Sequence, residues 1–140
     1  MAKTQSARID PKEYARILET LELKNLYLEK GTFNVDRERL KGSLTLKIKD
    51  TFSYRSAESG IAIIAEYTLV GKNKEKKSTI RLKATFVLQY ETPEGITDDF
   101  FDVFREVSLP FIVWPFIREY VYSITSRMYV PPLTLPQIHQ

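Results

Sequence analysis

The hydrophobic pattern of this chain begins with a helical period, changes to a period of two, and returns to a helical period. Asp10 and Pro11 have the residue types of a helix start, and apolar side chains follow at helical spacing. The sequence therefore predicts a short helix over residues 11–19. Four segments then alternate between apolar and polar positions, which is typical of half-buried strands. They are residues 21–28, 43–54, 60–70 and 79–90.

The alternation is clearest in residues 79–90. One phase holds Ile80, Leu82, Ala84, Phe86, Leu88 and Tyr90, and the opposite phase holds Arg81, Lys83, Thr85 and Gln89. Residues 31–42, between the first two strands, have the composition of a loop. We therefore expect a four-stranded antiparallel sheet with one apolar face and one polar face.

Two helices are predicted after the strands. Thr97 or Asp98 can cap a helix over residues 98–107, which Pro110 would end. A longer helix is expected over residues 111–128, with Pro115 in its first turn.

Strands and helices segregated in this way predict an α+β fold, in which the C-terminal helices pack on one face of the sheet. The length of 140 residues fits a single domain over residues 1–140. Residues 1–10 are expected to be flexible. Three prolines predict an extended tail over residues 129–140.

The composition excludes several kinds of chemistry. The chain has no cysteine, and its only histidine is His139, so disulfides and thiol catalysis are excluded and histidine-dependent catalysis is not expected. Asp98, Asp99 and Asp102 are candidates for a metal site or an acid/base pair, but carboxylates at a helix start more often act as caps. We therefore predict no catalytic residue, no metal and no cofactor.

The apolar runs of the chain are short. The N-terminal residues lack the apolar stretch of a secretory signal peptide. The longest strongly apolar run, residues 109–117, has half of the roughly 20 residues that a membrane span requires. These patterns predict a cytoplasmic protein without a membrane span.

The formal net charge of +3 is unevenly distributed. Residues 71–83 carry a net charge of +5, residues 91–106 carry −5, and Lys47 and Lys49 add to the basic phase of the strands. A basic sheet face is also found in nucleic-acid-binding proteins, which gives an alternative function. The aromatic side chains of residues 79–90 lie in the opposite phase, where bases cannot stack beside these charges, so this alternative is disfavoured.

The C-terminal stretch resembles the signature of the SecB family of ATP-independent export chaperones. In that family an apolar segment containing proline enters a long helix with an Arg-Glu pair, and this helix ends in Ser-Arg and a Pro-Leu turn. The matching residues here are Leu109, Pro115, Arg118, Glu119, Ser126, Arg127, Pro132, Leu133 and Leu135. With the strands in the family's order, the resemblance covers residues 21–136.

The resemblance implies a holding chaperone that binds unfolded polypeptide without catalysis. Its client would be either the antitoxin of a toxin-antitoxin-chaperone system or an export precursor. SecB proteins that act in export present an acidic sheet face to a basic tail of the SecA motor, whereas the matching positions here are basic. Because like charges repel, docking to SecA in the family's usual way is not expected.

The client groove is predicted between residues 27–35, the apolar edge of the second and fourth strands, and the C-terminal tail. In the SecB family a second helix after the Pro-Leu turn forms one wall of the groove. We expect this wall to be missing here or to be supplied by the N-terminal helix around Tyr14. The candidate client-binding residues are Tyr27, Phe33, Val35, Leu46, Ile48, Phe86, Leu88, Trp114, Leu133 and Leu135.

The long C-terminal helix is apolar over more than the one stripe that a single chain can bury. This surplus predicts a homo-oligomer, and the resemblance implies a dimer of dimers with paired sheet edges. The candidate interface residues are Phe116, Ile117, Tyr120, Val121 and Ile124.

Overall fold

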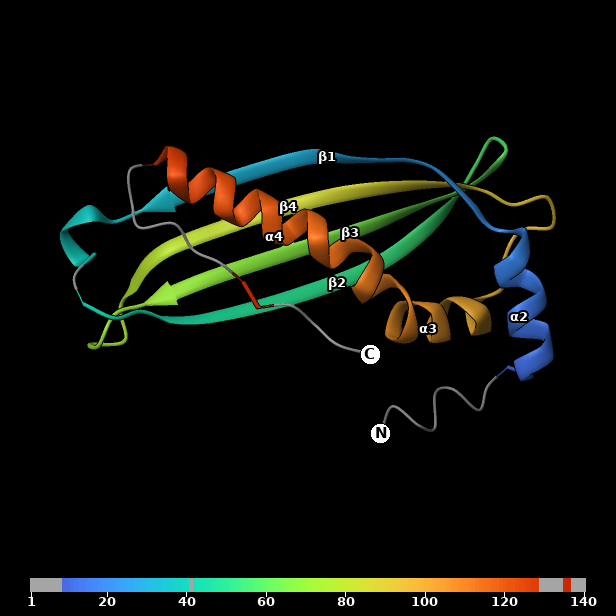
Figure 1. Ribbon diagram of the computed structural model, residues 1–140, viewed down its shortest axis with the longest axis horizontal. Helices are drawn as coiled ribbons and strands as arrows, with labels where there is room; N and C mark the ends of the chain where they lie inside the picture. Colours follow the sequence, from blue (N-terminus) through green and yellow to red (C-terminus); the bar gives the residue numbers. More distant parts are fainter. Residues whose placement is uncertain (1–8, 41, 129–134, 137–140) are drawn as a thin grey trace. The chain divides into compact units, whose positions relative to one another are not determined.

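The computed structural model describes residues 9–40, 42–128 and 135–136, and it has the predicted α+β fold (Figure 1). A short helix precedes four strands, and two helices follow them. The elements are α2 (Pro11–Thr20), β1 (Glu22–Val35), η1 (Arg37–Arg39), β2 (Thr45–Ala57), β3 (Gly60–Lys72), β4 (Ser78–Glu91), α3 (Asp98–Val107) and α4 (Leu109–Arg127).

The strands form one antiparallel sheet with the order β1-β4-β3-β2 (Figure 1). Strands β2, β3 and β4 follow one another through hairpins, whereas β1 pairs with β4, the last strand in the chain. Strands β1 and β2 are therefore the two edges of the sheet. The backbone N–H of Asp36, just beyond β1, donates to the carbonyl of Thr79 in β4 at 2.8 Å.

The predicted apolar phases of the two central strands are confirmed. All six apolar-phase residues of β4 are buried, each with at most 7% of its surface exposed. The same holds for the five apolar-phase residues of β3, which are Ile61, Ile63, Ala65, Tyr67 and Leu69. The predicted outward residues Arg81 and Lys83 are exposed. Three outward-phase residues are nevertheless buried: Ala62 of β3 is 3% exposed, and Thr79 and Val87 of β4 are 2% and 5% exposed.

The prediction of a loop over residues 31–42 is wrong at its start. Strand β1 continues to Val35, and only then does the chain turn through η1. Phe33 and Val35 are half-buried and keep the strand's alternation, while the exposed residues around them, such as Asn34, supply the loop-like composition. Pairing with β4, which is distant in sequence, determines where this strand ends.

Two compact units make up the chain. One unit is the body of the sheet, Asn25–Arg55 with Ala62–Gln89. The other contains the three α-helices together with the hairpin Ser56–Ile61 and the end of β4 from Tyr90. We call them the sheet unit and the helical unit, and each is described by itself.

The helical unit is held together by aromatic rings and by one close backbone approach. Tyr14 of α2 stacks on Phe100 of α3 at 4.9 Å between ring centroids, and Phe100 stacks on Phe104 at 5.4 Å. Phe104 also meets the edge of the Tyr90 ring at 6.0 Å. Gly60 lies directly against the Tyr90 backbone, where a Cβ atom would overlap the carbonyl oxygen of Tyr90. Only glycine fits at this position.

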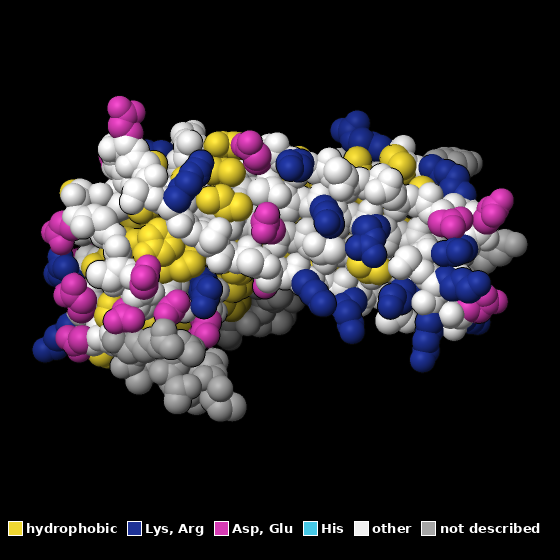
Figure 2. Space-filling view, turned by 180° about the vertical axis from the view of Figure 1, so that it is seen from behind, with side chains coloured by type: hydrophobic (Ala, Val, Ile, Leu, Met, Phe, Trp, Pro, Cys, Tyr) yellow, Lys and Arg dark blue, Asp and Glu magenta, His cyan; other side chains and the backbone are white. Residues whose placement is uncertain are grey.

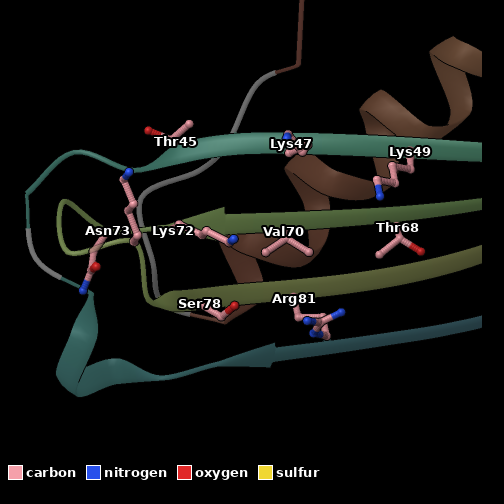
Figure 3. Close-up of a pocket in the computed structure, with 10 residues that line it drawn as sticks. Thr45, Lys47, Lys49, Thr68, Val70, Lys72, Asn73, Ser78 and Arg81 are labelled. Carbon is pink, nitrogen blue, oxygen red and sulfur yellow. The ribbon is translucent and has the colours of Figure 1, made fainter.

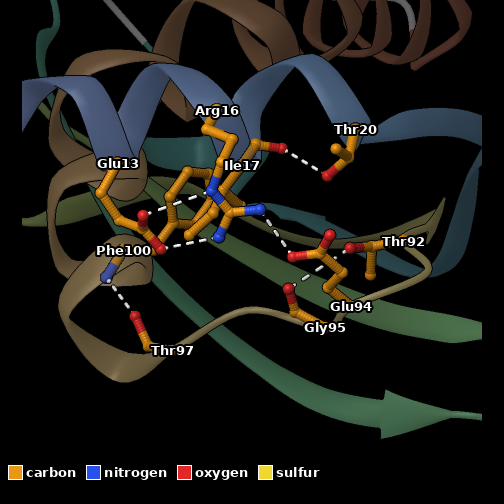
Figure 4. Close-up of polar contacts among 9 residues, drawn as sticks. All are labelled: Glu13, Arg16, Ile17, Thr20, Thr92, Glu94, Gly95, Thr97 and Phe100. Atoms are coloured by element: carbon orange, nitrogen blue, oxygen red, sulfur yellow. Dashed lines mark hydrogen bonds and ion pairs between the residues drawn. The ribbon is translucent and has the colours of Figure 1, made fainter.

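Polar contacts connect α2 to the segment before α3 (Figure 4). Arg16 lies between Glu13, at 2.8 Å, and Glu94, at 2.6 Å. These side chains are about half exposed, so the pairs contribute little stability. Thr97 caps α3 as predicted, because its hydroxyl accepts from the backbone N–H of Phe100 at 3.1 Å.

The start predicted for the long helix is wrong by two residues. Helix α4 begins at Leu109 immediately after α3 ends, so Pro110 lies in its first turn, where a missing N–H costs little. Pro115 therefore lies inside the helix and not in its first turn. A proline there leaves the carbonyl of Phe111 without its helical donor.

Candidate functional site

The edge strand β1 exposes large apolar side chains. Leu23 is 41% exposed, Tyr27 is 41% exposed and Leu28 is 40% exposed. Tyr27 and Leu28 are consecutive, so they point to opposite sides of the strand. A sheet edge also presents backbone groups that no strand of the described chain pairs. This edge therefore offers both apolar contacts and hydrogen bonds to an extended peptide.

The other strand residues predicted for the client groove differ in accessibility. Leu46 on the edge strand β2 is 38% exposed, and Phe33, Val35 and Ile48 are half-buried. Phe86 and Leu88 of β4 are 4% and 0% exposed. A peptide can reach the residues of the edge strands directly, whereas the two residues of β4 lie in the core.

Helix α4 carries two parallel apolar stripes, each with a spacing of four residues. The first stripe is fully buried and consists of Leu109, Val113, Ile117, Val121 and Thr125. The second stripe lies beside it and consists of Ile112, Phe116, Tyr120 and Ile124. Phe116 is 46% exposed and the others are half-buried. We call this second row the outer stripe of α4.

The five predicted interface residues divide between the two stripes. Phe116, Tyr120 and Ile124 belong to the outer stripe, and partial burial raises the pKa of the Tyr120 hydroxyl. Ile117 and Val121 are fully buried within the chain. Of the five predicted interface residues, those that a second chain could contact are therefore the three of the outer stripe.

Trp114 and Arg118, on the other flank of α4, bind the backbone of residues 135–136. The indole N–H of Trp114 donates to the carbonyl of Pro136 at 2.6 Å, and Nε of Arg118 donates to the carbonyl of Leu135 at 2.8 Å. The Leu135 side chain is 4% exposed. Two hydrogen bonds thus fasten residues 135–136 to α4. Leu133, also predicted for the groove, lies outside the described residues.

The acidic residues of α3 have structural roles. Asp98 and Asp99 lie in the first turn, where the helix dipole favours negative charge, and Asp102 pairs with Arg105 at 3.4 Å. Among the residues that the structure describes, no group of three or more His, Cys, Asp or Glu side chains could hold a metal ion. Within the same residues, every helix is too short or too polar to cross a membrane.

Two features of the site are not predicted by the sequence, namely the exposure of two leucines of β1 and the hydrogen bond of Arg118. Leu23 and Leu28 lie in a strand whose alternation predicted burial, yet both are exposed because β1 is an edge. The sequence places Arg118 in the C-terminal motif, but no local pattern indicates its bond to Leu135, which lies 17 residues further along the chain.

The comparisons with known proteins bear on the fold. No protein-family model matches the sequence, and no curated protein matches it either. Among solved structures, the SecB-like chaperone Rv1957 of Mycobacterium tuberculosis, solved in complex with a ChAD peptide from the antitoxin HigA1, is similar with a TM-score of 0.77. The match covers 92% of this chain and 98% of Rv1957 at 19% identity.

A protein of unknown function from Streptococcus agalactiae matches with a TM-score of 0.44 and 9% identity, over 83% of this chain and 96% of that one. Rv1957 is the informative comparison, since it matches almost end to end. The chain has the α+β fold of a SecB-like chaperone.

Proposed function

We propose that this protein is an ATP-independent holding chaperone that binds unfolded polypeptide. The observation that supports the proposal is the exposed apolar edge strand β1, in a chain whose fold is that of a SecB-like chaperone. Folded monomers rarely leave neighbouring large apolar side chains on an unpaired sheet edge, because such edges aggregate. Binding needs no chemical step, so the protein is not an enzyme in this proposal.

The binding mode follows from the geometry of β1. An extended client segment adds to the sheet beside β1, and its backbone pairs with the free edge of the strand. Tyr27 on one side and Leu28 on the other contact alternate client side chains, which also point to opposite sides. Backbone pairing is independent of client sequence, so the apolar contacts supply the selectivity for unfolded, apolar segments.

For the client, we favour a single antitoxin over a range of export precursors. Two observations support this choice. The similar structure of Rv1957 holds a peptide from an antitoxin. In addition, Lys47, Lys49, Arg81 and Lys83 are all exposed, so the sheet lacks the acidic surface that SecB proteins use for SecA. We place this activity in the cytoplasm, where an antitoxin is made.

We also propose that the chain assembles as a dimer of dimers, in which the outer stripe of α4 forms one of the two kinds of interface. Phe116 is nearly half exposed at the centre of that stripe. Phe116→Asp places a carboxylate in the interface and should dissociate the assembly, because burial of an unpaired charge is strongly unfavourable. Tyr122→Asp is the matched control, since Tyr122 is 51% exposed on α4 but lies outside the outer stripe. Light scattering that gives the monomer mass of 16.3 kDa for the wild type contradicts the assembly.

The chaperone proposal is tested by aggregation and titration assays without ATP. The wild-type protein should delay aggregation of a refolding client and bind an unfolded, labelled peptide. Leu28→Ala should weaken peptide binding, whereas Leu18→Ala should not, because Leu18 is a leucine of α2 with nearly the same exposure, 39%. Tyr27→Ala and Tyr122→Ala form a second matched pair. If the two variants of each pair bind the peptide with equal affinity, the assignment of the client site to β1 is wrong. If the wild-type protein does not delay aggregation of the client, the chaperone function is wrong.

A further inference from the structure

The sheet unit contains a hollow of about 620 Å³ that the proposed client binding does not use (Figure 3). Strands β2, β3 and β4 and the hairpin between β3 and β4 contribute its walls. The lining residues are Thr45, Lys47, Lys49, Thr68, Val70, Lys72, Asn73, Lys76, Ser78 and Arg81. We call it the basic hollow. The space-filling view shows Lys and Arg side chains gathered on the right-hand part of one face (Figure 2).

The charge of the basic hollow is not compensated. Four lysines and one arginine line it, and none of the ten lining residues is acidic. These five cations form no ion pair with an acidic residue in the part of the chain that the structure describes. Five positive charges around one hollow repel one another, and a bound polyanion would relieve that repulsion.

The cations are held on ordered backbone. Lys47 and Lys49 are alternate residues of β2, and Arg81 belongs to β4. In the hairpin, the Asn73 side-chain oxygen accepts from the backbone N–H groups of Glu75, at 3.0 Å, and Lys77, at 3.1 Å. Lys76 adopts the left-handed conformation with φ of 65° within this turn. The backbone that carries the charges is therefore held in place by the sheet and the turn, so binding has to order the side chains and not the backbone.

The chemistry of the lining favours an acidic polypeptide over a nucleic acid. No aromatic side chain lines the hollow, so bases have no stacking platform. Lys47 and Lys49 are about 7 Å apart along β2, which is the spacing of alternate side chains in an extended peptide. Carboxylates at positions i and i+2 of such a peptide can therefore face the two lysines in turn. Because β2 is an edge strand, a peptide can lie along it.

We propose that the basic hollow binds an extended acidic segment of a partner polypeptide, with closely spaced Asp or Glu side chains facing Lys47, Lys49, Lys72, Lys76 and Arg81. This site is separate from the apolar edge of β1 and does not depend on the client proposal. It gives the protein a second polypeptide-binding surface with a chemistry opposite to that of the client site.

The test uses fluorescence anisotropy of labelled hexaglutamate, with hexaglutamine as the neutral probe. Hexaglutamate should bind, hexaglutamine should not, and the affinity should fall as salt is added. Lys47→Glu with Lys49→Glu should raise the Kd for hexaglutamate about tenfold or more, because two attractive contacts become repulsive. Arg55→Glu is the matched control. Arg55 is exposed on the same strand, about 20 Å from Lys49, and should leave the Kd unchanged.

A second measurement needs no variant. Carbodiimide coupling of hexaglutamate to the wild-type protein should link it to lysines of the hollow, as identified by mass spectrometry. The proposal is overturned if hexaglutamate does not bind, or if coupling occurs mainly at lysines elsewhere. It is also overturned if oligothymidylate binds more tightly through the same lysines, which indicates a nucleic-acid surface. A last outcome would also overturn the proposal. If the wild-type protein self-associates and the double variant Lys47→Glu with Lys49→Glu does not, a second copy of the chain occupies the hollow.

Discussion

Replacing Arg118 by methionine should release residues 135–136 from α4. The change keeps an apolar stem beside Trp114 but deletes the donor that bonds the Leu135 carbonyl at 2.8 Å. A hydrogen bond from a charged donor contributes about 1.5–3 kcal/mol, and the Trp114 bond contributes about 1 kcal/mol. Burial of the Leu135 side chain adds about 1.5–3 kcal/mol.

These gains act against the entropy of ordering the chain. Fixing the backbone of two residues costs about 2–4 kcal/mol, so the attached state is favoured by only about 2–3 kcal/mol. Loss of the Arg118 bond removes nearly all of that margin. In Arg118→Met the attached and released states should therefore have comparable populations.

Trp114 reports this change directly, because it is the only tryptophan in the chain. We expect a red shift of its emission and stronger quenching by acrylamide in Arg118→Met. Arg105→Met is the matched control, since Arg105 makes an exposed pair in α3 and should leave both signals unchanged. The reasoning is refuted if neither Arg118→Met nor Leu135→Ala changes the emission or the quenching of Trp114. The two hydrogen bonds then do not fasten residues 135–136 to α4.

Three further predictions concern stability. Gly60→Ala should lower the free energy of unfolding by about 3 kcal/mol or more in urea titrations, because the Cβ of the new alanine overlaps the Tyr90 carbonyl. An unchanged free energy of unfolding contradicts this close approach. Pro115→Ala should raise the melting temperature by restoring a donor to the carbonyl of Phe111, and a lower value refutes the account of α4. Burial raises the pKa of Tyr90 to about 12, so the contribution of Tyr90 to stability should fall by about 2 kcal/mol as the pH rises from 10 to 12, where the unfolded state deprotonates first. Tyr90→Phe should make unfolding curves less sensitive to pH in that range.

The strands could be predicted because their signal is local. Each side chain of β4 alternates with its neighbours, so the pattern alone identified Leu88 as inward and Arg81 as outward. The same pattern cannot distinguish a central strand from an edge. Leu46 has the alternation of Leu88 but is 38% exposed, because strand order depends on which strands pair across the sheet.

The remaining differences also depend on contacts between distant residues. Phe33 belongs to β1 because the end of that strand pairs with β4, although its neighbours in sequence have the composition of a loop. The basic phase of β2 and β4 was visible in the sequence. The basic hollow was not, because Lys76 lies beside the strand residues only through the geometry of the hairpin.

The interleaving of the two units has a consequence for synthesis on the ribosome. Helix α2 is made first, but its ring contact, Phe100, belongs to α3, which follows all four strands. The sheet strands β1 to β4 are complete at Glu91, before α3 and α4 have been translated. The sheet can therefore begin to pair while α2 is still without its neighbours, and the helical unit closes last. During that interval, the apolar face of α2 around Ile17 is open to other nascent chains.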